Sequence, residues 1–557
     1  MSDTVSDTAA AKPDKKPAAF DLSKLMPDVG DILFCCVISI PLMMLPNLLF
    51  GDGSTGWHLV TGNYVLDNHC VPRQDLFSYS FADKPWVAYE WLSDALMAAL
   101  VRVGGLNLLT VAVSSAIGLL FMILYDRCRK EGCHFFLVLM ISMVGILVSA
   151  MHWLARPHIF VFFGVLIFSS ALEDFYRRTI SSTRLLITLA LYMVLWVNCH
   201  PLFLLGFILI LIYLCSSMAT AIYYAPGELR TQRLQSARAL ALALLFTFVA
   251  SLCNPYGFGL YSYILQYLHG SAVLAATDEF LSPVFHYGLH PTCLEILFAS
   301  FIIGLSISLK RLTLPRLLCC IAFSHLALTA VRNMPLAVII LLPAIAQLLS
   351  KTSFDPPQTG VSAEASQASD FHRSLPAAWW TNLVVRKWNY YGDMIHDEEW
   401  KYKMHAVPIV TAILLSIIAI MGGKVAGTEI LASGFDAKNK PTTTLEFLKK
   451  QEGDGKLSAN KGFNFDNWGG YINYKIGTRV FIDDRADFYG EKYYLQYSIL
   501  SQVLPGWQDL LKKEDFQWVL FPKDSRLAQA LMTAAGWKIA AQDPASYLLV
   551  RPDVSLP

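Results

Sequence analysis

The side chains that could carry acid–base chemistry stand at the ends of apolar runs. Asp52 follows directly on the first of these runs, with Gly51 and Gly53 on either side of it. Glycine lets the backbone turn sharply, so this carboxylate can lie close to the surface of an apolar layer. A carboxylate placed there can accept a proton as a general base. It can equally stay solvated or cap the next helical turn.

Two arginines stand in comparable positions. Arg156 and Arg332 each flank an apolar run, where a charge is costly unless it meets water or an anion. A planar guanidinium matches the oxygen atoms of a phosphate group. These arginines therefore either clamp a phosphate or form ion pairs with a nearby carboxylate such as Asp278 or Glu279.

Further polar residues flank the same runs and could contact a sugar hydroxyl or a phosphate oxygen. Ordinary packing or hydrogen bonding within loops explains them as well. Asp75 can be a turn former after Pro72, and Glu90 and Asp94 can share a solvated helix face because they are four residues apart. The candidate substrate-binding set, in addition to the two arginines, is His58, Asp75, Glu90, His158, Asn198, His200 and Glu279. The cysteines show no CxxC spacing, so no metal ligands are assigned from them.

The elements that must position these residues are apolar helices. Hydrophobic residues make up 55% of the chain and charged residues only 16%, whereas about a quarter of a soluble chain is charged. A net charge of +1 gives no reason to expect a nucleic-acid partner. Runs long enough for a hydrocarbon core of roughly 30 Å predict about eleven transmembrane helices. They lie near 31–50, 105–125, 134–153, 158–175, 184–198, 201–224, 238–253, 292–309, 315–331, 334–350 and 405–422.

The distribution of Lys and Arg predicts the orientation of these helices. Basic residues gather on the cytoplasmic side of membrane proteins. With the N-terminus inside, the inner segments collect most of them, and the outer face before the last predicted span at 405–422 keeps only Arg73, Lys84, Arg102, Arg156 and Arg332. The sequence thus predicts a multi-pass protein of the inner (cytoplasmic) membrane, surrounded by membrane lipids. The candidate residues then all emerge on the outer side, where they can build one site.

The chain divides into several predicted regions. Residues 1–30 are predicted to form a disordered cytoplasmic tail, because they are polar and lack the apolar core of a signal peptide. The transmembrane core of 31–350 includes a long first outer loop, 51–96, with helices near 57–67 and 88–103 lying along the membrane. A cytoplasmic loop of 351–404 carries an interfacial helix, and 405–422 is the last transmembrane helix.

Residues 435–557 predict a soluble extracytoplasmic domain, since charges return and the apolar runs shorten. Asp483, Asp484 and Arg485 follow an apolar run at a strand end, where ligands often bind; an acidic turn that caps Arg485 explains them too. The segment 468–471, Trp-Gly-Gly-Tyr, either presents a ring to a sugar or packs a tight turn. The domain is predicted to be an α/β sandwich with strands near 478–482, 517–521, 537–541 and 546–550, and helices near 443–451, 491–502, 506–513 and 525–535.

Several of these motifs together resemble the GT-C superfamily of membrane glycosyltransferases, within a largely uncharacterised bacterial group. The resemblance begins in the first outer loop and continues along most of the chain. It rests on Asp52, Trp57-His58, Gly62, Pro72, Asp75, Ser78-Tyr79, Trp86, Glu90-Trp91-Leu92, Arg156-Pro157-His158, Trp196 to His200, Asn254 to Gly257, Arg332 to Pro335, Trp468 to Tyr471 and Phe481 to Arg485.

The resemblance implies an enzyme of the inverting type that takes a sugar from a polyprenyl-phosphate carrier at the outer membrane face. The acceptor would be a glycan, a lipid or a protein, and Asp52 would be the catalytic residue. The first loop lacks the adjacent Asp-Glu pair of some relatives. A divalent metal therefore stays open as a cofactor, and its ligands stay unknown.

Two other functions fit a protein of this class. A transporter or flippase for a lipid-linked glycan would favour ionisable residues at mid-membrane depth, and here Glu295 and His325 are the visible ones. A non-catalytic protein of envelope assembly would use the terminal domain to bind partners. Asp52 discriminates between these functions, because only the enzyme needs its carboxylate.

Overall fold

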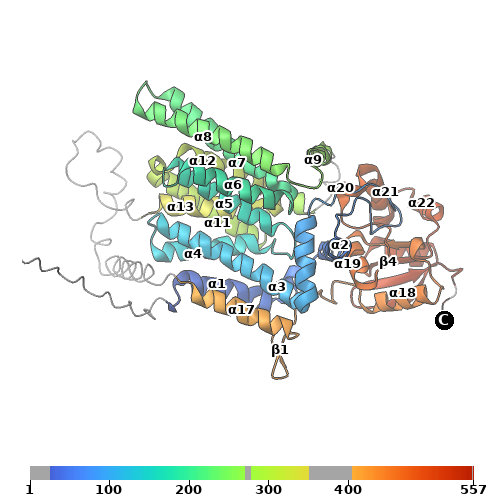
Figure 1. The fold of residues 1–557 in the computed structure, drawn as a ribbon. Helices are drawn as coiled ribbons and strands as arrows, with labels where there is room; N and C mark the ends of the chain where they lie inside the picture. The colour runs from blue at the N-terminus through green and yellow to red at the C-terminus, as the bar shows by residue number, and fades with distance from the viewer. Residues whose placement is uncertain (1–24, 270–277, 351–403, 555, 557) are drawn as a thin grey trace, which may run out of the picture.

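The chain forms a body of apolar helices and a smaller sheet-containing domain that lie side by side (Figure 1). The computed structural model describes residues 25–269, 278–350, 404–554 and 556. Helix α2 (Ser54–Asn68) lies between the two parts, where it packs against α19 (Asp466–Ile476) of the domain. Residues 51–96 therefore pack between the body and the domain.

Six helices in the described part of the chain are long and apolar enough to cross a membrane, and five shorter apolar helices accompany them. Each predicted run falls on one of these helices, so the prediction of a multi-pass helical membrane protein is confirmed. The long ones are α3 (Trp91–Lys130), α5 (Ile159–Tyr176), α7 (Leu204–Tyr223) with the turn Pro201–Phe203 before it, α8 (Glu228–Ser251), α11 (Leu289–Ser308) and α13 (Met334–Leu348). The shorter ones are α1 (Val29–Ser39), which continues as a π-helix over Ile40–Met44, α4 (Phe135–Ala150), α6 (Ser182–Val197), α12 (Leu314–Thr329) and α17 (Ala406–Ile420).

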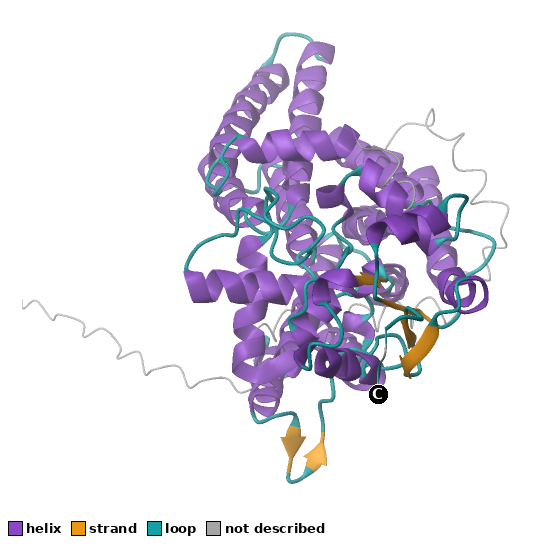
Figure 2. Ribbon diagram, turned by 90° about the vertical axis from the view of Figure 1, so that its right-hand side faces the viewer, coloured by secondary structure: helices purple, strands orange, loops and turns teal. Residues whose placement is uncertain are grey.

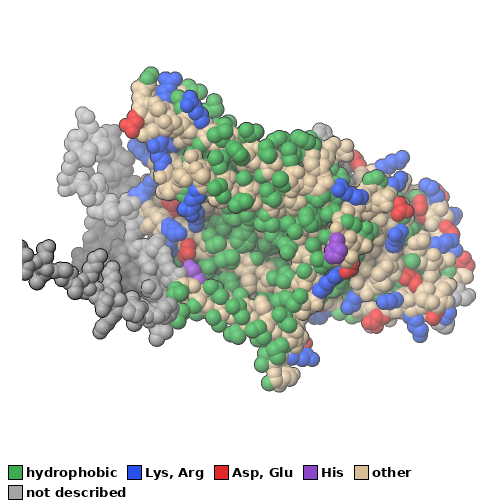
Figure 3. All heavy atoms as spheres, in the orientation of Figure 1, with side chains coloured by type: hydrophobic (Ala, Val, Ile, Leu, Met, Phe, Trp, Pro, Cys, Tyr) green, Lys and Arg blue, Asp and Glu red, His purple; other side chains and the backbone are tan. Residues whose placement is uncertain are grey.

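The surface of the body agrees with a membrane location. Hydrophobic side chains cover its middle, while charged side chains gather at the far end and on the domain (Figure 3). Leu191 on α6 and Ile222 on α7 are 69% and 79% exposed. A soluble protein rarely exposes an apolar surface of this extent, so this belt is the surface that meets lipid.

Helix α3 changes direction at two glycines. Gly105 has a φ of +65°, which L-residues other than glycine rarely adopt, and Gly104 before it is also non-helical. The segment before this kink runs across the ends of the spanning helices, and the segment after it enters the body (Figure 1). The predicted helices along the membrane near 57–67 and 88–103 correspond to α2 and to this first segment.

The terminal domain contains a four-stranded mixed sheet with the order β3-β4-β6-β5 (Figure 2). Strand β3 is parallel to β4, and β6 is antiparallel to both β4 and β5, with Leu520 opposite Leu548. The strands are β3 (Gly462–Asn464), β4 (Trp518–Pro522), β5 (Lys538–Gln542) and β6 (Ser546–Val550). A separate hairpin of β1 (Lys424–Val425) and β2 (Thr428–Glu429) follows α17.

Helices cover both faces of the sheet, because alternate residues of each strand point to opposite sides. Trp518 and Leu520 pack with side chains of α18 (Thr443–Gly453) and α19, whereas Val519 and Phe521 pack on the other face. The helices there are α20 (Ala486–Tyr489), α21 (Glu491–Ser501), α22 (Trp507–Glu514) and α23 (Arg526–Ala534). The prediction of an α-helical membrane body with a C-terminal α/β domain is therefore confirmed.

Two local predictions for this domain are wrong. The run 478–482 is no strand of the sheet; instead Val480 makes a single parallel bridge to Ser78 of the first outer loop. Segment 468–471 is no turn, because it lies inside α19, and Trp468 is only 3% exposed. The predicted interfacial helix of 351–404 and most of the predicted tail of 1–30 lie outside the described residues.

Candidate functional site

Glycines allow the terminal domain to approach the loop of residues 51–96 closely. A Cβ atom on Gly53 would lie 1.7 Å from the carbonyl oxygen of Asn467, and one on Gly56 would lie 2.3 Å from that of Gly470. Side chains at these positions would separate α2 from α19. The two adjacent glycines of 468–471 therefore serve close packing, which brings the acidic turn of the domain onto the start of α2.

A buried ion pair fixes the same junction from the other side. Arg485 Nη2 lies 2.7 Å from Asp75 Oδ1 and 2.7 Å from Asp483 Oδ2, and its guanidinium also covers the ring of Phe77. The second oxygen of Asp75 accepts hydrogen bonds from Ser78. Both carboxylate oxygens of Asp75 are thus engaged by the protein, and the geometry favours an anchoring role over the predicted contact with substrate.

Five charged residues and one serine at this junction form one connected group, which we call the junction cluster: Asp52, Ser54, Arg156, Glu279, Arg332 and Asp484. Arg156 is at its centre. The Arg156 guanidinium lies 3.1 Å from Asp52, 3.5 Å from Glu279 and 3.7 Å from Asp484. The charged side chains are 18–28% exposed, so a ligand can reach them.

Ser54 connects Arg156 with the terminal domain. Its hydroxyl accepts a hydrogen bond from Arg156 Nη2 and donates one to Asp484 Oδ2. The other oxygen of Asp484 accepts a hydrogen bond of 2.9 Å from Trp57 Nε1. Asp484, from a part of the chain 430 residues further on, is therefore a member of the same site as Ser54.

Glu279 stands between the two arginines. Its carboxylate lies 3.5 Å from Arg156 Nη1 and 3.2 Å from Arg332 Nη1. Ion pairing with a loop carboxylate was one of the two interpretations of these arginines, and it describes their contacts in this structure. The arrangement also shows that one anion can meet both guanidinium groups at once, which is what binding a phosphate would require.

The electrostatics of the cluster centre on Asp484. Burial raises the pKa of this carboxyl to about 7, although Arg156 works in the opposite direction. Burial also raises the pKa of Glu279, but Arg332 and Arg156 outweigh this effect and hold it below its usual value. Nearby Lys440 has its pKa lowered to about 8 by burial. Asp484 can therefore change its charge near neutral pH.

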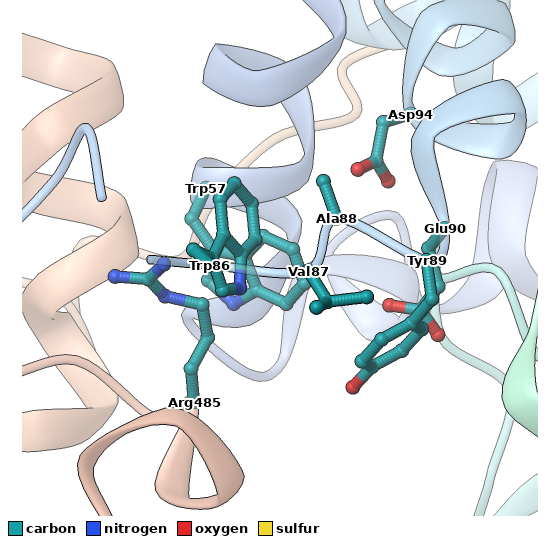
Figure 4. A pocket seen from close by; sticks show the side chains of 8 residues that line it. All are labelled: Trp57, Trp86, Val87, Ala88, Tyr89, Glu90, Asp94 and Arg485. Atoms are coloured by element: carbon teal, nitrogen blue, oxygen red, sulfur yellow. The ribbon is translucent and has the colours of Figure 1, made fainter. Parts of the chain in front are cut away.

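A second group of polar side chains lines a pocket beside the junction cluster (Figure 4). The indole rings of Trp57 and Trp86 lie toward one end of it, and the carboxylates of Glu90 and Asp94 toward the other. Tyr89 and Arg485 complete its polar and aromatic lining. Trp57 contacts both the junction cluster and the pocket, since its Nε1 donates a hydrogen bond to Asp484 while its ring borders the pocket.

Two histidines bind the carboxylates of this pocket. His58 Nδ1 lies 2.7 Å from Asp94 Oδ1 and 3.9 Å from Glu90, and His200 Nε2 lies 3.5 Å from Glu90. Burial, with a contribution from Arg156, holds the pKa of both imidazoles well below the usual value, so they are neutral. The sequence interpretation of Glu90 and Asp94 as a solvated helix face is wrong, because they are only 8% and 1% exposed.

Two further candidates have their polar atoms engaged inside the protein. Asn198 accepts a hydrogen bond from Trp91 and donates to the carbonyl oxygens of Val194 and Cys253. His158 Nε2 lies 2.9 Å from the carbonyl oxygen of His152. Hydrogen bonding within the structure, which was one interpretation of each residue, accounts for these contacts.

Sequence reasoning placed Asp52, Arg156, Glu279 and Arg332 at one site, and the structure brings these four together. The prediction from the sequence did not connect these four residues with Ser54, Asp484 or Lys440. A signal existed for Asp484, since an acidic pair follows an apolar run there. Nothing in the sequence marks Ser54 or Lys440.

The junction cluster offers little room for a metal ion, because the Arg156 guanidinium already occupies the space between its carboxylates. A divalent ion would have to displace this cation. In the described part of the chain, three close metal-ligating side chains occur at Asp28, Asp31 and His405, far from this junction. A divalent metal at the junction therefore has no ligand set of its own in this structure.

A comparison of the sequence with protein-family models finds no match, and a comparison with curated proteins finds none. Among solved structures, the chain is similar to the oligosaccharyltransferase of Archaeoglobus fulgidus. For the form tethered to an acceptor peptide containing the NVT sequon, the TM-score is 0.49 at 11% identity, covering 95% of this chain and 74% of that one. For the apo form it is 0.47 at 12% identity, covering 89% and 69%.

Proposed function

We propose that this protein is a membrane glycosyltransferase that moves a sugar from a polyprenyl-phosphate carrier to an envelope acceptor on the outer membrane face. One observation carries the proposal. A pocket lined by aromatic rings and carboxylates adjoins a pair of arginines at the end of the membrane body, and Trp57 belongs to both. The pocket in this structure is closed to anything much larger than a water molecule, so it must open when the donor binds. Aromatic rings with a few placed polar groups then suit a sugar, and paired guanidiniums suit the phosphate attached to it.

In this reaction the acceptor hydroxyl gives its proton to Asp52, and its oxygen attacks the anomeric carbon. The bond between that carbon and the phosphate oxygen breaks, and the electron pair stays on the phosphate. Arg156 and Arg332 stabilise the charge that develops on this leaving group. Glu279, which occupies the space between the two arginines, gives way to the phosphate when the donor binds.

Asp52 is the general base in this proposal, and Asp484 is the carboxylate to compare with it. Asp52 is 19% exposed and lies 3.1 Å from Arg156, so it borders the place assigned to the leaving phosphate. The pKa of Asp484 near 7 suits proton transfer at neutral pH. Its two oxygens are held by Ser54 and Trp57, however, which makes it a positioning residue for the start of α2.

The test compares Asp52→Asn, Asp484→Asn and the exposed control Asp524→Asn in a deletion strain. Mass spectrometry of polyprenyl-linked sugars and envelope glycans identifies the product that disappears on deletion and measures its recovery. General-base assistance is typically worth about 10²–10⁴-fold in rate. We expect Asp52→Asn to lose at least 10²-fold in product formation, while the control restores it fully.

Binding and chemistry are separated with purified protein. Asp52→Asn should still bind the carrier lipid, whereas Arg156→Ala and Arg332→Ala should bind it weakly, and Arg156→Lys should recover only part because it lacks the planar fork. If the Asp52→Asn variant forms product at the parental rate, Asp52 is not the general base. If deletion removes no sugar product and the purified protein does not bind the carrier lipid, the proposal that the protein is an enzyme is wrong.

A further inference from the structure

Two acidic residues and a histidine meet at the far end of the body. Asp28 is the N-cap of α1, Asp31 lies in its first turn, and His405 directly precedes α17, so the ends of the first and last apolar helices of the described chain supply the group. The two helices pack against each other. Their shared end lies opposite the terminal domain (Figure 1), so this group is separate from the junction cluster.

The three donor atoms are arranged at distances that suit a small cation. His405 Nδ1 lies 2.8 Å from Asp31 Oδ1 and 3.9 Å from Asp28 Oδ2, and all donors are within 4.8 Å of one another. Ligands of a tetrahedral ion with bonds of about 2.0–2.1 Å stand roughly 3.3 Å apart. The two measured distances bracket this value, so a shift of about half an ångström brings the donors into place.

Burial makes the two carboxylates expensive without a cation. Asp31 is fully buried and Asp28 is 8% exposed, and His405 is the one cationic partner that the described residues offer them. A reciprocal cap explains part of this arrangement. Asp28 Oδ1 accepts from the backbone of Asp31, and Asp31 Oδ2 accepts at 3.4 Å from the backbone of Asp28.

The cap uses only one oxygen of the Asp28 carboxylate. Asp28 Oδ2 accepts no hydrogen bond from any described residue, and it faces the imidazole across 3.9 Å. His405 itself has a φ of +45° and a ψ of 38°, in the left-handed region that histidine adopts more often than most residues.

We propose that Asp28, Asp31 and His405 bind one divalent metal ion, with Zn²⁺ as the best match, and that this ion fastens the first apolar helix to the last. Carboxylate oxygens and imidazole nitrogens are both Zn²⁺ ligands, and water can take the fourth position of a site with three protein ligands. Mg²⁺ prefers oxygen donors in octahedral geometry and fits less well. The ion supplies the positive charge that the two buried carboxylates lack.

The experiment uses the full-length protein in detergent, purified through a tag without histidines. Bound metal is removed with a chelator, and the protein is then dialysed against Zn²⁺. Metal analysis should find one more ion per chain in the parent than in Asp31→Asn or His405→Gln, while Asp524→Asn matches the parent. Replacement by Co²⁺ should give the visible spectrum of a tetrahedral site without a thiolate charge-transfer band. This control excludes binding by the free cysteines as the source of the ion.

Asp28→Asn separates metal binding from helix capping, because Asn caps a helix as well as Asp does. In the presence of chelator this variant should unfold at the parental temperature or above it, since it removes an uncompensated charge. Zn²⁺ should raise the unfolding temperature of the parent and leave that of the variant unchanged. Equal metal content in the parent and the ligand variants, or a cysteine-type Co²⁺ spectrum that persists in them, overturns the proposal.

Discussion

Replacing Asp484 with Asn tests whether the terminal domain and the membrane body share one electrostatic site. The folded protein holds the pKa of Asp484 at about 7, against 3.8 for the free side chain. Between these two values the folded chain keeps a proton that the unfolded chain has lost. The stability of the folded state therefore falls as pH rises through this window, and it is constant above it.

The size of the effect follows from the shift. One pKa unit corresponds to about 1.36 kcal/mol, so the change from 3.8 to about 7 sets a ceiling near 4 kcal/mol. The side chain is 18% exposed, and water lowers the effect. We compare the change in the free energy of unfolding that Asp484→Asn causes at two pH values. At neutral pH and above, this change should be more stabilising by about 1–3 kcal/mol than near pH 4.

Tryptophan fluorescence during thermal unfolding in detergent measures this, because Trp57 donates its hydrogen bond to Asp484. The Asn side chain still offers an oxygen to Trp57, so the charge is the main change. The parent and Asp524→Asn should lose stability together between about pH 4 and pH 7, while Asp484→Asn should not. Parallel curves for all three proteins would refute the assignment of a buried, shared site.

Three further predictions test the junction and the orientation. Gly56→Ala places a methyl group 2.3 Å from the carbonyl oxygen of Gly470, so limited proteolysis should release the terminal domain faster than in Gly453→Ala, whose methyl group meets nothing within 4 Å. Asp75→Asn removes one of the two carboxylates paired with buried Arg485 and should destabilise the protein by about 1–3 kcal/mol in denaturant unfolding, whereas Asp67→Asn, in an exposed pair, should change it little. In a background without native cysteines, a cysteine at position 524 should react with an impermeant reagent outside the cell and one at position 232 should not; the reverse pattern would move the junction cluster to the cytoplasm.

Hydropathy predicted the membrane helices well because lipid imposes one simple demand, an apolar stretch of sufficient length. The break in α3 at Gly104 and Gly105 agrees with the prediction of separate helices near 88–103 and 105–125. Helix α19 was missed since two adjacent glycines normally indicate a turn. Close packing against α2 overrides that tendency here.

The site was predictable in part for a related reason. Charged residues at the ends of apolar runs must come to the membrane surface, which brought Asp52, Arg156 and Arg332 together in the prediction. Pairing across the chain follows no such rule. The contact of Ser54 with Asp484 depends on how a terminal domain docks, and no local pattern in the sequence specifies it.

The separation of Ser54 and Asp484 by 430 residues also bears on how the protein is made. A ribosome adds about 5–20 residues per second, so Asp52 and Ser54 are synthesised roughly 20–90 s before the aspartate that completes their site. Throughout this interval the first outer loop has no domain to dock on. A nascent or truncated chain therefore cannot assemble the junction, and only a chain that has been translated and inserted to its end acquires a complete charged site.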